Sequence, residues 1–481
     1  MNFFTAILGR LKQMFSHGTD VGKAFGVQLI ESSVMEGKVR LWNSISSDVP
    51  PWLDADDGIT TINMAKHISD TRAKLVTLDL GIAVSGSGTS ASDMAEDVKP
   101  LSGRAEWMQK IADNLIERLP DNVADAERLG GFVVKYNGES WDFLLPGDFW
   151  ITAVDGDKKI VGAIFPEYIT KGQERFTRLE YHRFEDGQYV VTNKAYRDRT
   201  IGTESHTLGS LVPLNSVEEW ADMREETRMA GVEKPLFGYF RIPGSNTFDP
   251  SSPLGCAVFA NALVELEAID VGVSRKNDEV SDSKHITFVG QTVIQQAQNR
   301  NIKLPRFVQG LGVGLSDGDV SAIHEHTPSL LTDQRIKDIN FNLSLAAVKC
   351  GFSEGFFVLD GQRGVITATQ VESDDRDTIQ TIKNDRDALK AAIEQALYGA
   401  DVLASLMNLS PRGDYEVTFS FGDITYSYEE DKANWKYYVA QGWVPAWKYL
   451  VKFEKMTEEE ARALTSEANN GRERGLFDQE E

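Results

Sequence analysis

The sequence predicts an α+β protein because the spacing of its apolar residues changes twice along the chain. In residues 59–79 and 104–119 apolar side chains recur every three or four positions, the period of an amphipathic helix. From 130 to 243 the period is two, as in half-buried strands. Beyond 251 the helical period returns, and a short glycine-rich insert interrupts it. The 481 residues have room for two to four domains of about 150 residues each.

The N-terminal residues predict a helix that docks on the body of the protein or on a neighbouring subunit. They lack the long apolar stretch and the small-residue cleavage site of a signal peptide. A helix lying on a membrane surface is the alternative. Its apolar residues share one helical face: Phe3, Phe4, Ile7, Leu8, Leu11 and Phe15. After the helix at 59–79, the glycines and serines of 86–90 predict a loop.

The segment 130–243 predicts an antiparallel meander of about six strands. Asn137-Gly138 follows an apolar run and is a strong signal for a tight hairpin. Asp155-Gly156 and Asp186-Gly187 mark further turns between alternating runs. A strand over 236–242 is expected to close the segment.

The next segment predicts two helices joined by a small β-containing insert, 281–326. For the first helix, we expect Ser251 or Ser252 to cap the N-terminus and Pro253 to occupy the first turn. Its apolar stripe is followed by a run that is polar on all sides, Arg275 to Glu279. Gly272 lies within the helix and makes its length and straightness less regular. A helix with such an end extends into water or packs against copies of itself through polar contacts. The second helix follows a stripe of five residues: Ile336, Ile339, Leu343, Ala347 and Cys350.

The last third predicts one long helix, one strand and a charged helical end. The long helix, 376–408, has room to span nearly 50 Å at about 1.5 Å per residue. Pro411 and Gly413 end it, and Glu416 to Phe421 alternates as a strand. Residues 469–481 form an acidic tail.

Composition limits the functions available to the chain. The net charge is −23, with 73 acidic and 50 basic residues, which disfavours tight, sequence-reading binding to DNA. No run approaches 18 apolar residues, so no membrane-spanning segment is predicted. Cys256 and Cys350 allow one disulfide, but two free thiols and a reducing compartment are the better reading.

Motifs for catalysis, cofactors and metals are weak, and we predict none of these sites. The glycines at 310, 312 and 314 lack the strand-to-helix context of a phosphate loop. His324 and His326 share a side only if their stretch is a strand, and no other histidine joins them in sequence. The acidic turns at 54–58 and 317–319 lack the glutamate that an EF-hand loop needs at its twelfth position.

Two further groups of residues support alternative functions. A carbohydrate-active hydrolase would use carboxylates beside a sugar groove. Aromatic residues for such a groove are Trp141, Phe149, Trp150 and Tyr189, although a place in the core of the β region explains them better. Basic residues for contacts with phosphates or acidic partners are Arg300, Lys303 and Arg306, which a solvated face also explains.

The order of these parts, together with several short strings, resembles the portal proteins of tailed bacteriophages, in particular the long-tailed phages of Gram-positive hosts. The resemblance covers residues 25–460 approximately. The strings are Phe165-Pro-Glu-Tyr-Ile-Thr170, Thr177-Arg-Leu-Glu-Tyr-His-Arg-Phe184, Thr192-Asn-Lys-Ala-Tyr196, Pro235-Leu-Phe-Gly-Tyr-Phe240 and Ser252-Pro-Leu-Gly255.

The resemblance implies a portal-like architecture with a mixed α/β wing, a two-helix stem, a small β-containing clip and a helical crown. The implied parts are residues 1–250 for the wing, 251–280 and 327–350 for the stem helices, 281–326 for the clip, 351–375 for the tunnel-loop region, and 376–481 for the long helix and the crown with its acidic tail. It nominates Asp374, Asp375 and Arg376 for the channel loop, and Arg300, Lys303 and Arg306 for the clip.

The function that the resemblance implies is structural, with no enzymatic activity and no cofactor. Twelve copies would form a ring at one capsid vertex of the virion, assembled in the host cytoplasm. The implied partners are the terminase large subunit, the head–tail adaptor, the major capsid and scaffold proteins, and double-stranded DNA that passes non-specifically; no membrane is involved. Another phage structural protein, a minor capsid or tail component, is the alternative from the same class.

Overall fold

The structure, a computed structural model, shows the predicted α+β fold. It describes residues 18–53, 58–86, 103–199, 208–282, 286–290, 299–300, 308–311, 323–326, 330–358, 376–422, 436, 439, 445–454, 457 and 461–465. The chain divides into two units, Met1–Ser420 and Phe421–Glu481. The predicted N-terminal helix and the acidic tail lie outside the described residues.

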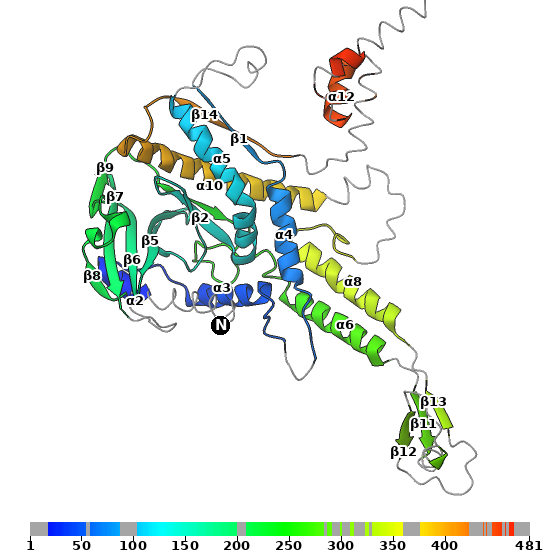
Figure 1. The fold of residues 1–481 in the computed structure, drawn as a ribbon. Helices are drawn as coiled ribbons and strands as arrows, with labels where there is room; N and C mark the ends of the chain where they lie inside the picture. The colour runs from blue at the N-terminus through cyan, green and yellow to red at the C-terminus, as the bar shows by residue number, and fades with distance from the viewer. Residues whose placement is uncertain are drawn as a thin grey trace, which may run out of the picture. The chain divides into compact units, whose positions relative to one another are not determined.

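The β-rich segment is antiparallel, as predicted, but its strands form two sheets instead of one meander (Figure 1). The first sheet has the order β10-β2-β3, with β2 at Gly131–Tyr136, β3 at Trp141–Leu144 and β10 at Phe237–Arg241. The second sheet has the order β4-β5-β6-β7-β8, and β9 also pairs with β7. Its strands are β4 Trp150–Val154, β5 Ile160–Lys171, β6 Glu174–Glu185, β7 Gln188–Asp198, β8 Ser210–Val212 and β9 Glu226–Met229. Alternation identifies strands but does not say which strands pair.

The predicted hairpin turns are confirmed. The turn 137–140, which begins with Asn137-Gly138, joins β2 to β3, and Gly138 has a φ of 105°. Asp186 and Gly187 join β6 to β7, both with positive φ, as the tight turn between two twisted strands requires. Two short 3₁₀ helices, Leu214–Ser216 and Glu218–Trp220, follow β8.

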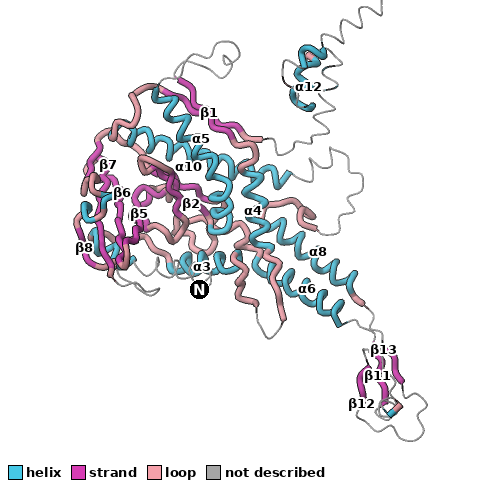
Figure 2. The backbone as a smooth tube through the Cα atoms, viewed as in Figure 1, coloured by secondary structure: helices cyan, strands magenta, loops and turns pink. Residues whose placement is uncertain are grey.

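Helices α5 and α10 pack against the first sheet (Figure 2). Helix α5, Gly103–Leu129, continues past Pro120, where the prediction ended it, because Val123, Ala126 and Leu129 extend its buried stripe. Helix α10, Arg376–Leu406, confirms the predicted long helix. A Cβ on Gly238 of β10 would lie 1.9 Å from the carbonyl oxygen of Ala392, so the strand approaches α10 more closely than a side chain allows.

The remaining helices of this part are α2 Gly18–Phe25, α3 Ser33–Ser46 and α4 Met64–Val76. Helix α4 lies within the predicted 59–79 segment, whereas α2 and α3 were not predicted individually. Strand β14, Tyr415–Ser420, confirms the predicted late strand and pairs with β1, Gly81–Gly86. Strand β1 ends at Gly86, the first residue of the predicted loop 86–90, and residues 87–90 lie outside the described residues.

The two predicted helices around the insert are present, but the predicted start of the first is wrong. Helix α6 spans Leu263–Asp282, so Ser251, Ser252 and Pro253 neither cap it nor form its first turn. The chain before α6 is instead held to the body by turns: the Val258 amide donates to the Glu127 carbonyl, and Phe259 is buried. The residues that predicted a helix start lie in a turn, in which the Ser252 amide donates to the Asp249 carbonyl.

The insert forms a small sheet of the order β12-β11-β13. Its strands are β11 Ile286–Gly290, β12 Val308–Leu311 and β13 Ile323–His326. Strand β11 pairs in parallel with β12 and antiparallel with β13, and helix α8, Thr332–Lys349, follows. In the second unit, the helix α12 spans Ala446–Glu454.

Candidate functional site: the α6–α8 helix pair

Helices α6 and α8 form an antiparallel pair that ion pairs close at both ends (Figure 1). At one end the Arg335 guanidinium donates to the Glu279 carboxylate, which also accepts from the Leu331 amide. At the other end Lys349 Nζ lies 2.5 Å from Glu265 Oε1. In the run Arg275 to Glu279, which the sequence showed as polar on all sides, Glu279 therefore has partners at the start of α8.

Between these ends the two helices share a buried apolar seam. The residues of the seam are Leu266, Ile269, Ile339, Leu343, Ala346 and Ala347. Gly272, which seemed to fit a regular helix poorly, faces this seam: a Cβ there would lie 3.0 Å from Ile339 Cγ1. The glycine therefore allows α8 to approach α6 at this position.

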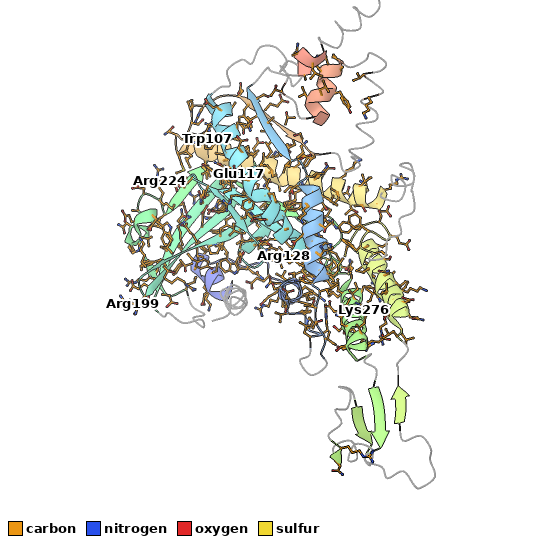
Figure 3. All side chains as sticks on the ribbon, turned by 45° about the vertical axis from the view of Figure 1, so that its right-hand side comes forward. Trp107, Glu117, Arg128, Arg199, Arg224 and Lys276 are labelled. Atoms are coloured by element: carbon orange, nitrogen blue, oxygen red, sulfur yellow. The ribbon has the colours of Figure 1, made fainter. Side chains whose placement is uncertain are left out.

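A strap formed by residues 52–53 and 58–62 hydrogen-bonds the buried polar side chains of α6. Asp270 is 3% exposed and accepts from the Trp52 indole at 2.9 Å and from the Ile62 amide at 3.0 Å. Ser274 accepts from the Thr60 amide at 2.9 Å. Because buried polar groups are costly without partners, the strap accounts for polar residues on this side of α6. Lys276, labelled in Figure 3, lies two residues after Ser274 in α6.

The outer face of α8 carries an apolar stripe that no described residue covers. Phe341, Leu345 and Val348 are spaced by four and three residues, so they share one face of the helix. They are 62%, 37% and 56% exposed. On α6, Val264 is 73% exposed. Contiguous apolar surface of this kind is typical of a contact face.

A buried charged junction, centred on Arg72, joins α4, α5 and α10 to the end of α8. Arg72 Nε and Nη2 donate to the two oxygens of Asp385 at 2.7 and 2.9 Å. Arg72 Nη1 donates to the Cys350 carbonyl at 2.9 Å, directly after α8. Glu127 Oε2 lies 3.3 Å from Arg72 Nε, but neither oxygen of Glu127 has a hydrogen-bond partner among the described residues.

The junction holds two carboxyl groups and one guanidinium, all nearly inaccessible to solvent. Burial raises the pKa of Glu127 well above the usual carboxyl range, and Asp385 adds to this while Arg72 opposes it. Burial also raises the pKa of Asp385, but Arg72 opposes this shift, since Asp385 is the one carboxyl group of the junction that Arg72 hydrogen-bonds. Of the two carboxyl groups, Glu127 therefore binds a proton more readily, because Arg72 hydrogen-bonds Asp385 and not Glu127.

The sequence contained a signal for this junction. Arg72 stands on the apolar face of the predicted helix 59–79, among Ala65, Ile68 and Val76. A charged residue in such a stripe is buried only if it is paired. Its partners, which come from residues far along the chain, could not be identified without the fold.

The residues nominated for the channel loop and the insert fall only partly within the described structure. Arg376 is exposed and is the first residue of α10, whereas Asp374 and Asp375 lie outside the described residues. Arg300 is exposed, and Lys303 and Arg306 lie outside the described residues. The structure thus leaves both groups as predictions.

A polar hollow of about 310 Å³ opens between the two sheets of the β-rich segment. Its buried charges form a closed network: Lys135 Nζ lies 3.1 Å from Asp142 and 3.2 Å from Glu180. Arg178 contacts both Glu180 and Glu167. Burial acts to raise the pKa of Glu180, but Lys135 and Arg178 outweigh it and hold that pKa well below the usual range.

His182 extends this network into the core. Its Nε2 lies 2.6 Å from Glu180, and its Nδ1 lies 2.9 Å from the Tyr189 hydroxyl, which accepts from the Leu236 amide. Burial, the largest cause, lowers the pKa of His182 although Glu180 opposes the shift. A neutral imidazole with a proton on Nε2 satisfies all these contacts.

The hollow differs from the site that the hydrolase alternative requires. Each of its carboxylates is paired with a cation, and neither Trp141 nor Trp150 lines it. Trp141 is buried and donates its indole N–H to the Ile111 carbonyl at 2.8 Å. Trp150 lines a different, smaller pocket. The aromatic residues proposed for a sugar groove are thus not gathered around these carboxylates.

Among the residues that the structure describes, no group of three or more histidine, cysteine, aspartate or glutamate side chains is arranged to hold a metal ion. Cys256 and Cys350 are free thiols, as the sequence favoured. Within the same residues, every helix is too short or too polar to cross a membrane.

Comparison with known proteins yields no assignment. No family model matches the chain, and no curated protein matches it significantly.

Proposed function

We propose that this protein is a portal protein, which forms a ring at one capsid vertex, passes double-stranded DNA during packaging and ejection, and connects the head to the tail. The observation that carries the proposal is the uncovered apolar stripe on α8, formed by Phe341, Leu345 and Val348. The inner seam of the α6–α8 pair is already complete, so the stripe is not needed for that pair. A neighbouring copy of the pair would cover it.

The arrangement of the elements also supports a ring. A helix pair with a small sheet between its helices corresponds to a stem with a clip, in the order that the resemblance implies. In a ring, each copy contacts its two neighbours through two different surfaces. The stripe on α8 of one copy would therefore pack against a different surface of the next copy, not against the next copy's stripe. Val264 on α6 offers an apolar surface for this contact.

The charge of the chain is compatible with a channel for DNA. Each lysine or arginine that neutralises a phosphate increases the affinity for DNA through counterion release. A channel through which DNA slides should make few such contacts. A net charge of −23 agrees with this requirement.

Electron microscopy and native mass spectrometry of the purified protein would test the proposal. We expect rings with a central hole and a mass near twelve times 53.5 kDa. Phe341→Glu should shift the protein towards monomers, because a carboxylate would be buried at the contact between subunits. The matched control is Leu211→Glu on β8, where the wild-type side chain is 65% exposed, and it should leave the ring intact.

A protein that stays monomeric under all conditions would overturn the proposal. So would rings that Phe341→Glu and Leu211→Glu affect equally. Circular dichroism of both variants would show whether each remains folded, so that a loss of assembly is distinguished from unfolding.

A further inference from the structure

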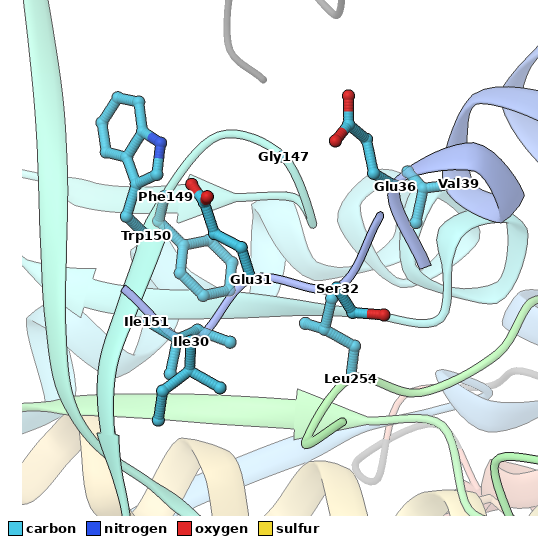
Figure 4. A pocket seen from close by; sticks show the side chains of 10 residues that line it. All are labelled: Ile30, Glu31, Ser32, Glu36, Val39, Gly147, Phe149, Trp150, Ile151 and Leu254. Carbon is cyan, nitrogen blue, oxygen red and sulfur yellow. The ribbon is translucent and has the colours of Figure 1, made fainter. Parts of the chain in front are cut away.

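A small pocket lies where the chain passes from α2 into α3 and meets β4 (Figure 4). Its volume is about 60 Å³. Aliphatic and aromatic side chains form most of its wall: Ile30, Val39, Phe149, Trp150, Ile151 and Leu254. The Ile30 amide donates to the Ile151 carbonyl at 2.7 Å, which fixes one wall against the edge of β4.

Two carboxylates, those of Glu31 and Glu36, accompany this apolar wall. Both point towards the top of the view in Figure 4. Glu36 pairs with Arg40. Partial burial, followed by the nearby charge of Glu36, raises the pKa of Glu31. An arriving cation would relieve the cost of keeping Glu31 ionised. The pocket thus suits an occupant that is both apolar and basic.

The first seventeen residues of this chain have that chemistry. They contain Arg10 and Lys12 and no carboxylate; the first acidic residue of the chain is Asp20. This is unusual in a protein of net charge −23. The same stretch has six large apolar residues on one helical face, as the sequence predicts.

The segment also joins the structure beside the pocket. Helix α2 begins at Gly18, directly after it. Val21 and Phe25 of α2 pack in one apolar cluster with Trp150, which lines the pocket. Seventeen residues span roughly 25 Å as a helix and roughly twice that when extended, so the segment can turn back onto the pocket.

We propose that residues 1–17 dock on this pocket of their own chain, with apolar side chains against the exposed surfaces of Ile30 and Leu254 and a basic side chain beside Glu31. The docked segment would brace the linker between α2 and α3 against β4. This inference does not depend on the proposed ring function.

The test compares the full chain with a variant that lacks residues 2–17. Hydrogen exchange of 30–39 and 147–151 should be faster in the truncated protein, while exchange in α10 should not change. A synthetic peptide of residues 1–17 added to the truncated protein should restore protection. Unchanged exchange on truncation, or a peptide that does not bind, would refute the docking.

Charge reversal tests the pairing with Glu31. Glu31→Lys in the truncated protein should weaken binding of the peptide by about fivefold, and a peptide with Arg10→Glu and Lys12→Glu should recover part of the loss. Glu117→Lys on the exposed face of α5, labelled in Figure 3, is the matched control and should not change binding. Equal weakening by Glu31→Lys and Glu117→Lys would contradict the pairing.

Cross-linking distinguishes docking within one chain from docking on a neighbour. With Lys12→Cys and Gly147→Cys in the full chain, we expect a cross-link within one polypeptide. Cross-links found only between chains would overturn the proposed arrangement.

Discussion

Replacing Arg72 with methionine should destabilise the first unit by about 3–5 kcal/mol, the cost of removing one partner from a buried ion pair. Arg72 makes two hydrogen bonds to Asp385 and one to the Cys350 carbonyl, at 2.7–2.9 Å. Methionine keeps much of the side-chain volume but leaves Asp385 with no cation at a fully buried position. The carboxyl must then take up a proton or remain charged without a counterion.

The two carboxyl groups of the junction should respond differently to neutralisation. Asp385→Asn should cost about 1–3 kcal/mol, less than Arg72→Met, because Glu127 can ionise and take over the pairing with Arg72. Glu127→Gln should not destabilise the protein at pH 7, since the pKa of Glu127 is raised and neither of its oxygens has a hydrogen-bond partner among the described residues.

The pH dependence of the stability of Glu127→Gln distinguishes the effect of protonating Glu127 from the effect of its packing. The folded-state pKa of Glu127 is raised, so the folded protein holds a proton that the unfolded chain releases above its ordinary value of 4.5. This contribution is therefore fully present below pH 4.5 and declines as the pH rises through the folded-state pKa. The decline should be absent from the glutamine variant.

Urea unfolding, followed by circular dichroism between pH 5 and 8, measures all three variants. The midpoints should rank Glu127→Gln above Asp385→Asn and Asp385→Asn above Arg72→Met at pH 7. If Arg72→Met costs less than about 1 kcal/mol, or if Glu127→Gln costs more than Asp385→Asn, the proposed charge distribution in the junction is wrong.

Three further substitutions test the packing and the polar hollow. Gly272→Val should lower stability by about 1–3 kcal/mol, measured as a shift in Tm, and adding Ile339→Ala should recover part of it because the two sites are in contact. Gly238→Ala should prevent stable packing of α10, since its Cβ would meet a backbone oxygen at 1.9 Å, whereas Gly156→Ala, with open space around it, should leave the Tm unchanged. Glu180→Gln should reduce stability at neutral pH and make the loss of stability in acid less steep. The lowered pKa of Glu180 stabilises the folded state above pH 4.5, and this stabilisation is lost as the pH falls through the folded-state pKa. A dependence of the Tm on acid pH that is identical to that of the wild type would contradict this.

The local elements were predictable because their signals are local. Asn137-Gly138 and Asp186-Gly187 predict tight turns by their backbone preferences, and both turns are present. The apolar period identified α10 nearly to its ends. The start of α6 was predicted wrongly, because Ser251-Ser252-Pro253 also suits a turn and only the hydrogen bond from Val258 to the body shows that the chain is not yet helical there.

The candidate site was predictable in outline only. The sequence by itself determined that two helices flank a β-containing insert, because a change of period is visible in one stretch of chain. It also marked Gly272 as an exception to its helical pattern. The tertiary structure alone decided the role of Gly272, which faces Ile339, and the partner of Arg72, which is Asp385. It also decided which apolar residues stay uncovered, since the face of α8 with Phe341 is outer only because α6 occupies the opposite one. These properties depend on residues far apart in sequence, and neither periodicity nor propensity reports on such pairs.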